Sequence, residues 1–126
     1  MSFSFSKEER LCSRLLIEQL YAEGHRMMAF PYSVQWLVRP PDSELCQVLI
    51  VAPKRRFHHA VDRNRVKRLT RECWRHVKPQ LYEALAAHGA RMTLSLVYIH
   101  NEILPYDKLM AAQEKMVNQL IKELEK

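Results

Sequence analysis

Apolar residues recur at helical spacing near both ends of the chain and in its middle, and strand-like apolar runs lie between these regions. A first helix is predicted from about residue 7 to residue 23, because Ser6 and Glu9 form a capping box and Gly24 favours a helix end. One side of this helix is apolar and carries Leu11, Leu15, Leu16 and Leu20. The other side has a narrower mixed stripe of Arg10, Arg14, Ile17 and Tyr21.

Three runs are predicted to be strands. Residues 32–38 alternate between apolar and polar side chains, and residues 92–99 place Leu94 and Leu96 opposite Ser95. Residues 45–52 are apolar enough to form a central strand.

The remaining helices are predicted from spacing and from proline and glycine positions. A basic helix covers about residues 60–77, a short helix runs from Pro79 to residue 87 before Gly89, and Pro105 opens the last helix. With 126 residues, the chain suits a single domain over residues 1–126. The predicted fold is α+β, an αββαβα sandwich of helices on a small sheet.

Composition is that of a globular protein, with 48% hydrophobic and 27% charged residues. The chain shows no apolar run of the ~20 residues that span a bilayer, and Met1-Ser2-Phe3 begins no secretory signal. The three cysteines, Cys12, Cys46 and Cys73, are odd in number and far apart. We therefore expect buried thiols and a cytoplasmic location.

Positive charge is concentrated in one stretch. Residues 54–78, here called the basic segment, hold ten Lys or Arg and two acidic residues, a net formal charge of +8. Because the whole chain carries +6, the remainder carries −2. Charge focused in this way is typical of a surface that binds a polyanion, most often nucleic acid.

A helical projection separates the basic segment into two faces. The polar face carries Arg63, Asn64, Lys67, Arg68, Arg71 and Arg75, and the apolar face carries Val66, Leu69, Cys73 and Val77. Arg65 lies off both faces, within reach of Glu72 or of a rim. Guanidinium forks suit phosphate oxygens, whereas an ordinary solvated face mixes both signs of charge. The projection therefore favours an RNA or DNA contact over a merely solvated helix.

The sequence offers little for protein-based catalysis. Cys73 and His76 have no second Cys/His pair at zinc spacing, and no paired carboxylates or Ser/His/Asp set stands out. We therefore predict no catalytic residues and no metal ligands. Trp36 is expected in the core, and the position of Trp74 at the border of the two faces leaves its role open.

The residues around the basic segment resemble a known signature. Pro53-Lys54-Arg55, followed by Ala60-Val61-Asp62-Arg63-Asn64-Arg65-Val66-Lys67-Arg68-Leu69-Thr70-Arg71-Glu72, is similar to the signature of the bacterial ribonuclease P protein component. The resemblance implies a protein that binds a large catalytic RNA. The complex removes the 5′ leader from precursor tRNA, with Mg²⁺ carried mainly by the RNA. It also implies an unusual left-handed crossover around the basic helix, and it implies no DNA or membrane partner.

The resemblance, together with the projection, assigns two sets of residues. The RNA-binding set is Lys54, Arg55, Arg56, Arg63, Asn64, Arg65, Lys67, Arg68, Arg71 and Arg75. The leader-binding cleft, between the first helix and the sheet, is Arg10, Arg14, Ile17 and Tyr21. The family's two usual aromatic positions fall on Ile17 and Tyr21, so Ile17 departs from the pattern. An apolar pair beside two cations suits single-stranded nucleic acid, but Ile17 and Tyr21 would also suit simple packing on the sheet.

Two other functions compete with a ribonuclease P role. A structural, ribosomal-type RNA-binding protein without turnover fits the charge, but it leaves the stripe of Ile17 and Tyr21 without a use. A nuclease with its own active site requires a carboxylate or histidine cluster, which the sequence does not present.

Overall fold

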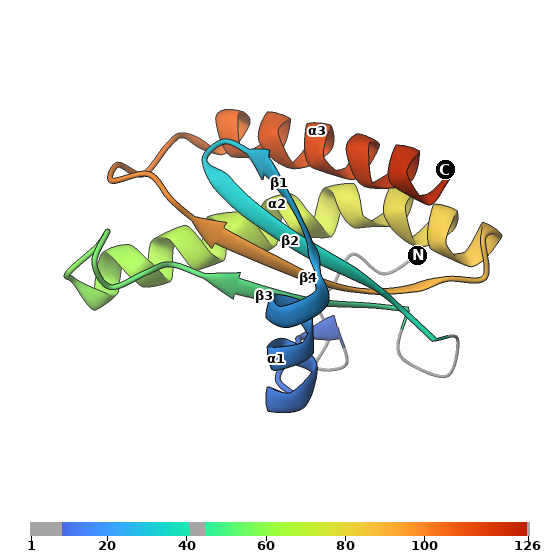
Figure 1. Cartoon of the computed structure of the whole chain (residues 1–126). Coiled ribbons are helices and arrows are strands. Elements are labelled where there is room, and N and C mark those ends of the chain that lie inside the picture. The colour runs from blue at the N-terminus through green and yellow to red at the C-terminus, as the bar shows by residue number, and fades with distance from the viewer. Residues whose placement is uncertain (1–8, 41–44, 126) are drawn as a thin grey trace.

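A four-stranded sheet with helices on both faces forms the body of the protein (Figure 1). The computed structural model describes residues 9–40 and 45–125. Its elements are α1 (Arg14–Glu23), β1 (His25–Ala29), β2 (Tyr32–Arg39), β3 (Cys46–Val51), α2 (Ala60–Ala87), β4 (Arg91–Tyr98) and α3 (Tyr106–Leu124). The predicted α+β class is confirmed, and the order gains one strand, β1, that the sequence did not suggest.

The strand order across the sheet is β1-β2-β4-β3. The pairs β1–β2 and β2–β4 are antiparallel, and β3 runs parallel to β4 with Val48 opposite Leu94. The prediction that residues 45–52 form a central strand is therefore wrong, because β3 lies at an edge. Its outer edge is covered by an extended N-terminal segment, where the Leu11 N–H donates to the Val48 carbonyl at 2.9 Å. This cover explains why an edge strand is so apolar.

The connection from β3 through α2 to β4 has the uncommon hand. In Figure 1 both strands run to the left, β4 lies above β3, and α2 passes behind the sheet. That arrangement is a left-handed crossover, as the family resemblance implies. Parallel strands joined by a helix are otherwise right-handed in about 98% of cases.

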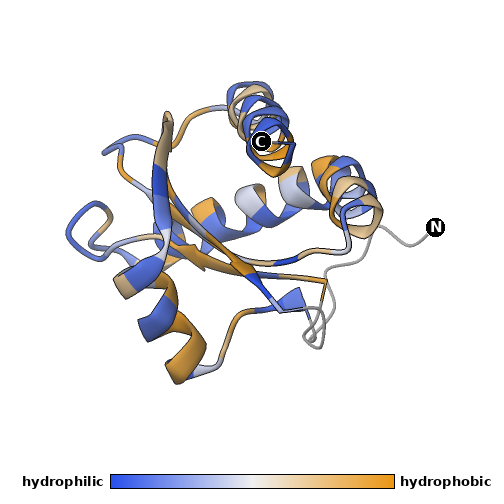
Figure 2. Ribbon diagram, turned by 45° about the vertical axis from the view of Figure 1, so that its right-hand side comes forward, coloured by the Kyte–Doolittle hydropathy of each residue, from blue (hydrophilic) through white to orange (hydrophobic). Residues whose placement is uncertain are grey.

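The main core lies between the sheet and the pair α2 and α3, while α1 crosses the opposite face (Figure 2). Val66, Val77 and Leu94 contribute to this core. Trp74 is also fully buried, so it belongs to the core rather than to a surface. Deep in the same layer, Tyr32 hydrogen-bonds the Thr70 hydroxyl at 2.9 Å, and burial raises the pKa of Tyr32 to about 12.

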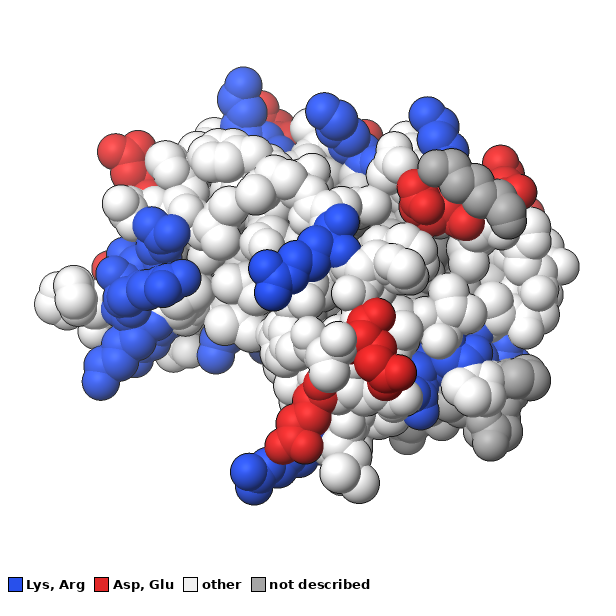
Figure 3. Space-filling model, viewed as in Figure 1, with Lys and Arg blue, Asp and Glu red and all other residues white. Residues whose placement is uncertain are grey.

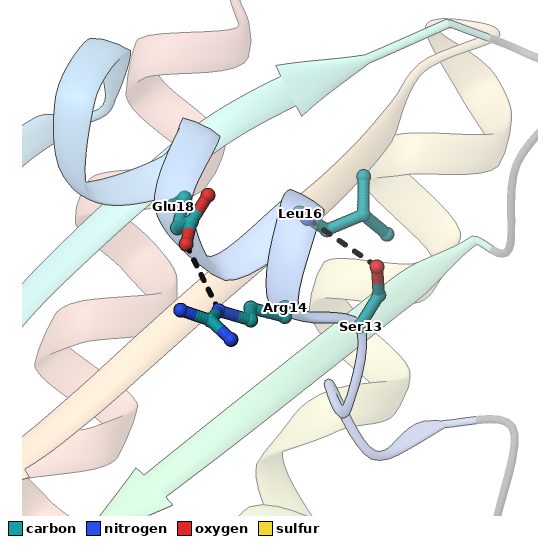
Figure 4. Close-up of polar contacts among 4 residues, drawn as sticks. All are labelled: Ser13, Arg14, Leu16 and Glu18. Carbon is teal, nitrogen blue, oxygen red and sulfur yellow. Dashed lines mark hydrogen bonds and ion pairs between the residues drawn. The ribbon is translucent and has the colours of Figure 1, made fainter.

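The first helix is shorter than predicted. It begins at Arg14, and the Ser13 hydroxyl accepts the Leu16 N–H at 3.4 Å as its cap (Figure 4). The proposed cap Ser6 lies outside the described residues, but residues 11–13 are not helical because this stretch runs beside β3. On the apolar side of this helix Leu20 is buried, whereas Leu15 is 78% exposed.

The predicted break at Pro79 is also wrong, because α2 is one helix of 28 residues with Pro79 inside it. Proline removes a backbone donor from a helix, but Leu81 and Leu85 continue the buried face that Val77 belongs to. Packing of this face outweighs the local cost. Gly89, with φ 61°, ends the helix region as predicted.

Two of the three cysteines follow the expectation of burial. Cys46 and Cys73 are buried, and burial raises the pKa of the Cys73 thiol to about 12, so it stays protonated at neutral pH. Cys12 is exposed, which corrects the prediction for that residue. It lies in the extended segment rather than on a packed helix.

Lys78 belongs to the basic segment but not to the surface. Its side chain is 5% exposed and its Nζ lies 2.6 Å from the Glu9 carboxylate. The Tyr82 hydroxyl donates to the same carboxylate, and burial is the main cause of a raised pKa for Tyr82. This buried pair joins the N-terminal segment to α2, and it removes one cation from the charge available to a partner.

Breaking the Lys78–Glu9 pair should destabilise the protein. We expect Lys78→Met to lower the free energy of unfolding, by up to roughly 3–5 kcal/mol, because it leaves the largely buried Glu9 carboxylate without the Lys78 ammonium group. The matched control is Arg14→Met, which removes a partner from the exposed Arg14–Glu18 pair (Figure 4) and should leave stability unchanged. Urea titration of both variants measures the difference. If the two variants were equally stable, the Lys78–Glu9 pair would not contribute to the stability of the fold.

Candidate nucleic-acid interface

Cationic side chains gather at one end of the molecule. Figure 3 shows them at the left of the view, over the loop that follows β3 and the start of α2. The loop is fixed from beneath by Phe57, which is 6% exposed and lies against Tyr98 with ring centroids 5.7 Å apart. Arg56 joins the loop to the segment after β4 by donating a hydrogen bond to the Asn101 side chain at 3.1 Å. The loop is therefore held in one arrangement before any partner binds.

Arg63 supports the start of α2. One of its guanidinium nitrogens donates to the carbonyls of Phe57, at 2.8 Å, and of His58, at 3.0 Å. His59, the residue before the helix, provides no side-chain cap. The hydrogen bonds from Arg63 therefore hold the loop to the first turn of the helix. Arg63 was predicted to bind RNA, and the structure gives it a structural role as well.

Most of the predicted RNA-binding side chains have no partner among the residues that the structure describes. Within residues 9–40 and 45–125, no side-chain hydrogen bond or ion pair engages a set that we call the basic surface. Its members are Lys54, Arg55, Asn64, Arg65, Lys67, Arg68 and Arg71. Three of its arginines and Asn64 surround an open hollow of ≈ 390 Å³ beside Val61. These side chains are donors without acceptors, which is the state that suits binding of phosphate.

Arg75 differs from the rest of the predicted set. Its guanidinium lies 2.7 Å from the Glu72 carboxylate, and both side chains are less than half exposed. The sequence had placed Glu72 within reach of Arg65, but Arg65 remains exposed without that partner. Arg75 is therefore less available to a ligand than its position on the projection suggested.

A second hollow connects the two predicted sets of site residues. Arg10 from the N-terminal segment and Lys67 and Arg71 from α2 line a groove of ≈ 220 Å³. Its floor includes Leu11 and the middle of β3. Arg10 had been assigned to the leader cleft and the other two to the RNA-binding helix, so the structure brings residues of both sets to one place.

The remaining leader-cleft residues lie on α1. Tyr21 is 41% exposed, and its hydroxyl forms a 3.0 Å hydrogen bond with the Ser95 hydroxyl of β4. Ile17 is half-buried one turn away, whereas Arg14 points to solvent and pairs with Glu18 at 3.2 Å (Figure 4). The four predicted residues are not one helical stripe, because Arg10 precedes the helix. Tyr21 neither packs fully on the sheet nor stands free of it.

Ser95 is the residue of this region that sequence reasoning missed. It is fully buried on the sheet face that α1 covers, and its neighbours in the chain are the apolar residues Leu94 and Leu96. Strand alternation did place it opposite those leucines. Only the tertiary contact with Tyr21 gives its hydroxyl a use.

The basic surface offers hydrogen-bond donors, which suit anionic groups rather than metal ions. Across the described ranges, no three His, Cys, Asp or Glu residues are grouped so that they could hold a metal ion. A search of the same residues finds no helix with the length and apolarity needed to cross a bilayer. The donors on the basic surface are suited to an anionic partner.

Comparison with known proteins identifies the family. Residues 5–125 match the Ribonuclease P family. The chain is 31% identical over 115 residues to the ribonuclease P protein component of Porphyromonas gingivalis, covering 90% of this chain and 84% of that protein. It is 34% identical over 73 residues to the corresponding protein of Nitrosococcus oceani, covering 58% of this chain and 60% of that one.

Solved structures share the fold. The RNase P protein of Thermotoga maritima superposes with a TM-score of 0.69 at 17% identity, covering 88% of this chain and 96% of that one. The RNase P protein of Staphylococcus aureus gives 0.66 at 16% identity, with coverages of 90% and 95%. Family match, relatives and geometry agree: the chain belongs to the ribonuclease P protein family and is a protein subunit of that ribonucleoprotein, which is an endoribonuclease.

Proposed function

We propose that this subunit binds the catalytic RNA through its basic surface and binds the 5′ leader of precursor tRNA beside α1. The complex then removes the leader to give the mature tRNA 5′ end, in the cytoplasm, with residues 1–126 acting as one domain. The observation that carries the proposal is the basic surface itself. Six cations and one amide share one end of the molecule without partners among the described residues. So many unpaired like charges are costly in a free protein and are neutralised by a polyanion.

Mg²⁺ and the bond-breaking chemistry belong to the RNA in this proposal. Guanidinium and ammonium groups donate hydrogen bonds and cannot ligate a hard cation, which takes oxygen ligands. The residues of the basic surface therefore do not fit a magnesium site. Their role is to hold and orient RNA phosphates, so that the RNA carries the metal and the reacting groups.

The leader is proposed to lie along α1 and the adjoining groove. The Tyr21 ring is partly open to solvent, and the bond from its hydroxyl to Ser95 fixes the ring's orientation. A ring held in place loses little entropy when a base stacks on it. Arg10 would take a phosphate of the same strand from the groove between β3 and α2, where it lies beside Lys67 and Arg71 of the basic surface. Ile17 adds apolar contact without a ring face.

A direct test of the function is leader removal at low Mg²⁺. Purified protein added to the ribonuclease P RNA of the same genome should promote cleavage of precursor tRNA under conditions where the RNA alone is slow. Protein without that RNA should leave the substrate intact. If protein alone cuts the leader, the active site lies in the polypeptide. If the active RNA is unaffected by the protein, a structural RNA-binding role is correct instead.

Binding to the catalytic RNA should depend steeply on salt. Six cations predict a slope of roughly −4 to −6 in a plot of log affinity against log salt concentration. Arg65→Ala and Arg68→Ala should each weaken binding by roughly 1.5–3 kcal/mol and reduce the slope by about 1. Circular dichroism should show both variants folded, since both side chains are exposed.

Arg63→Ala is the informative comparison. It removes hydrogen bonds to two loop carbonyls, so it should lower thermal stability as well as RNA affinity. A slope near −1 for the wild type, or lost structure in the Arg65 and Arg68 variants, would show that RNA binds elsewhere.

Tyr21→Ala should weaken binding of precursor tRNA by roughly 1–3 kcal/mol if the ring stacks on a leader base. Affinity for mature tRNA, which lacks a leader, should hardly change, and assembly with the catalytic RNA should survive. Ile17→Ala should give a smaller loss in the same direction, and Ile17→Phe should be neutral or tighten leader binding. The measurement is the ratio of the two dissociation constants, with and without leader. If the ratio is unchanged in a folded Tyr21→Ala protein, Tyr21 does not contact the leader and serves only to pack α1 on the sheet.

A further inference from the structure

Two rings meet at the end of the sheet where the basic loop lies. Phe30, in the turn between β1 and β2, lies against His100, which follows β4, with ring centroids 5.2 Å apart and an interplanar angle of 60°. Phe30 is 57% exposed, so much of its surface is open to solvent. A single exposed aromatic residue is ordinary on a protein surface. An exposed aromatic ring that contacts a second ring, at the end of the sheet where a cationic loop lies, is less common.

Hydrogen bonds hold this ring pair in place. The Ile99 N–H donates to the Pro31 carbonyl at 2.9 Å, which joins the two segments that carry the rings. The Tyr98 hydroxyl donates to the Glu102 carbonyl at 2.8 Å and accepts the Leu104 N–H at 3.0 Å. The backbone on both sides of His100 is therefore held in place before a ligand arrives.

The segment that carries His100 is joined to the loop before α2 rather than to Tyr21. Asn101, next to His100 in the chain, accepts the hydrogen bond from Arg56 in the basic loop at 3.1 Å. Ser95, the partner of Tyr21, lies five residues before His100, which corresponds to about 16 Å of extended chain. The loop that carries Lys54 and Arg55 is thus hydrogen-bonded to the segment that carries His100. A ligand on Phe30 would be separate from a leader strand on Tyr21.

We propose that Phe30 and His100 form a stacking platform for an unpaired nucleobase of the catalytic RNA. In this arrangement Lys54 and Arg55 hold the adjoining phosphates. Aromatic rings beside cations are the combination that single-stranded nucleic acid uses, since the cations take the backbone and the ring takes the base. The inference rests on the proposed binding of that RNA to the basic surface, and it adds a contact that charge does not supply.

The test separates stacking from charge and from general packing. Full-length wild type, Phe30→Leu and Phe30→Trp are titrated with the ribonuclease P RNA of the same genome at several salt concentrations. Phe30→Leu keeps apolar bulk but removes the ring, so affinity should fall about 5- to 50-fold. Phe30→Trp keeps a ring face and should bind at least as tightly as the wild type. The matched control is Met28→Ala, an exposed apolar residue of β1 that should not change affinity.

Salt dependence identifies the kind of contact. Loss of a stacked base removes no charge, so the Phe30→Leu slope should equal that of the wild type, whereas Arg65→Ala should flatten it by about 1. His100→Leu should also weaken binding, and the double variant should lose less than the product of the two single losses, because the rings act as one surface.

Several outcomes would overturn the platform. These are wild-type affinity in Phe30→Leu, an equal loss in Phe30→Trp, or a changed ratio of leader-bearing to mature tRNA affinity, which would mean that the rings contact the leader instead. If the arginine variants lose affinity while Phe30→Leu does not, the platform alone is wrong. If the arginine variants also bind normally, the proposed RNA surface is wrong.

Discussion

Burial of one face of α2 is the constraint on which the rest of the structure depends. That face packs Val66, Trp74 and Leu85 between the sheet and α3, and it fixes the rotation of the helix about its own axis. The opposite face must then be exposed, and it carries the cations of the basic surface. Mutual repulsion of neighbouring cations costs about 0.2–0.5 kcal/mol per close pair. Core burial on the scale of a few kcal/mol per large side chain outweighs this cost.

The extended N-terminal segment links the two proposed RNA surfaces. It lies along β3, where Leu11 is hydrogen-bonded, and the buried Glu9–Lys78 pair joins it to α2. This path carries Arg10 into the groove beside Lys67 and Arg71. A segment that seals a sheet edge thereby also completes a cationic groove. The leader and the catalytic RNA are therefore proposed to meet the protein on adjoining rather than independent surfaces.

Hydrogen bonds within the protein divide the basic residues by role. Arg56 and Arg63 stabilise the loop before α2, and Arg75 pairs with Glu72. The neighbouring cations are left without partners among the described residues, so they are available to phosphate. In the proposed function the protein contributes by positioning RNA, because the loop and the start of α2 are already held in one arrangement when a phosphate strand binds.

The sequence by itself determined the features that depend on local spacing and charge. The two faces of the basic helix, the alternation in residues 32–38 and 92–99, Pro105 before α3 and the family signature are all contained in short stretches of chain. Hydrophobic periodicity and side-chain type decide such features before any long-range contact forms. The α+β class and the ribonuclease P family followed from them.

Only the tertiary structure decided the features that depend on which segments meet. The edge position of β3, the extended course of residues 11–13 and the burial of Lys78 each follow from contacts between distant parts of the chain. The helix continues through Pro79 because its buried face gains more from packing than the missing hydrogen bond costs. Strand β1 has no clear alternation of its own and forms by pairing with β2. In each case a long-range contact outweighed a local preference. A local sequence pattern carries no information about which distant segment the residues will contact.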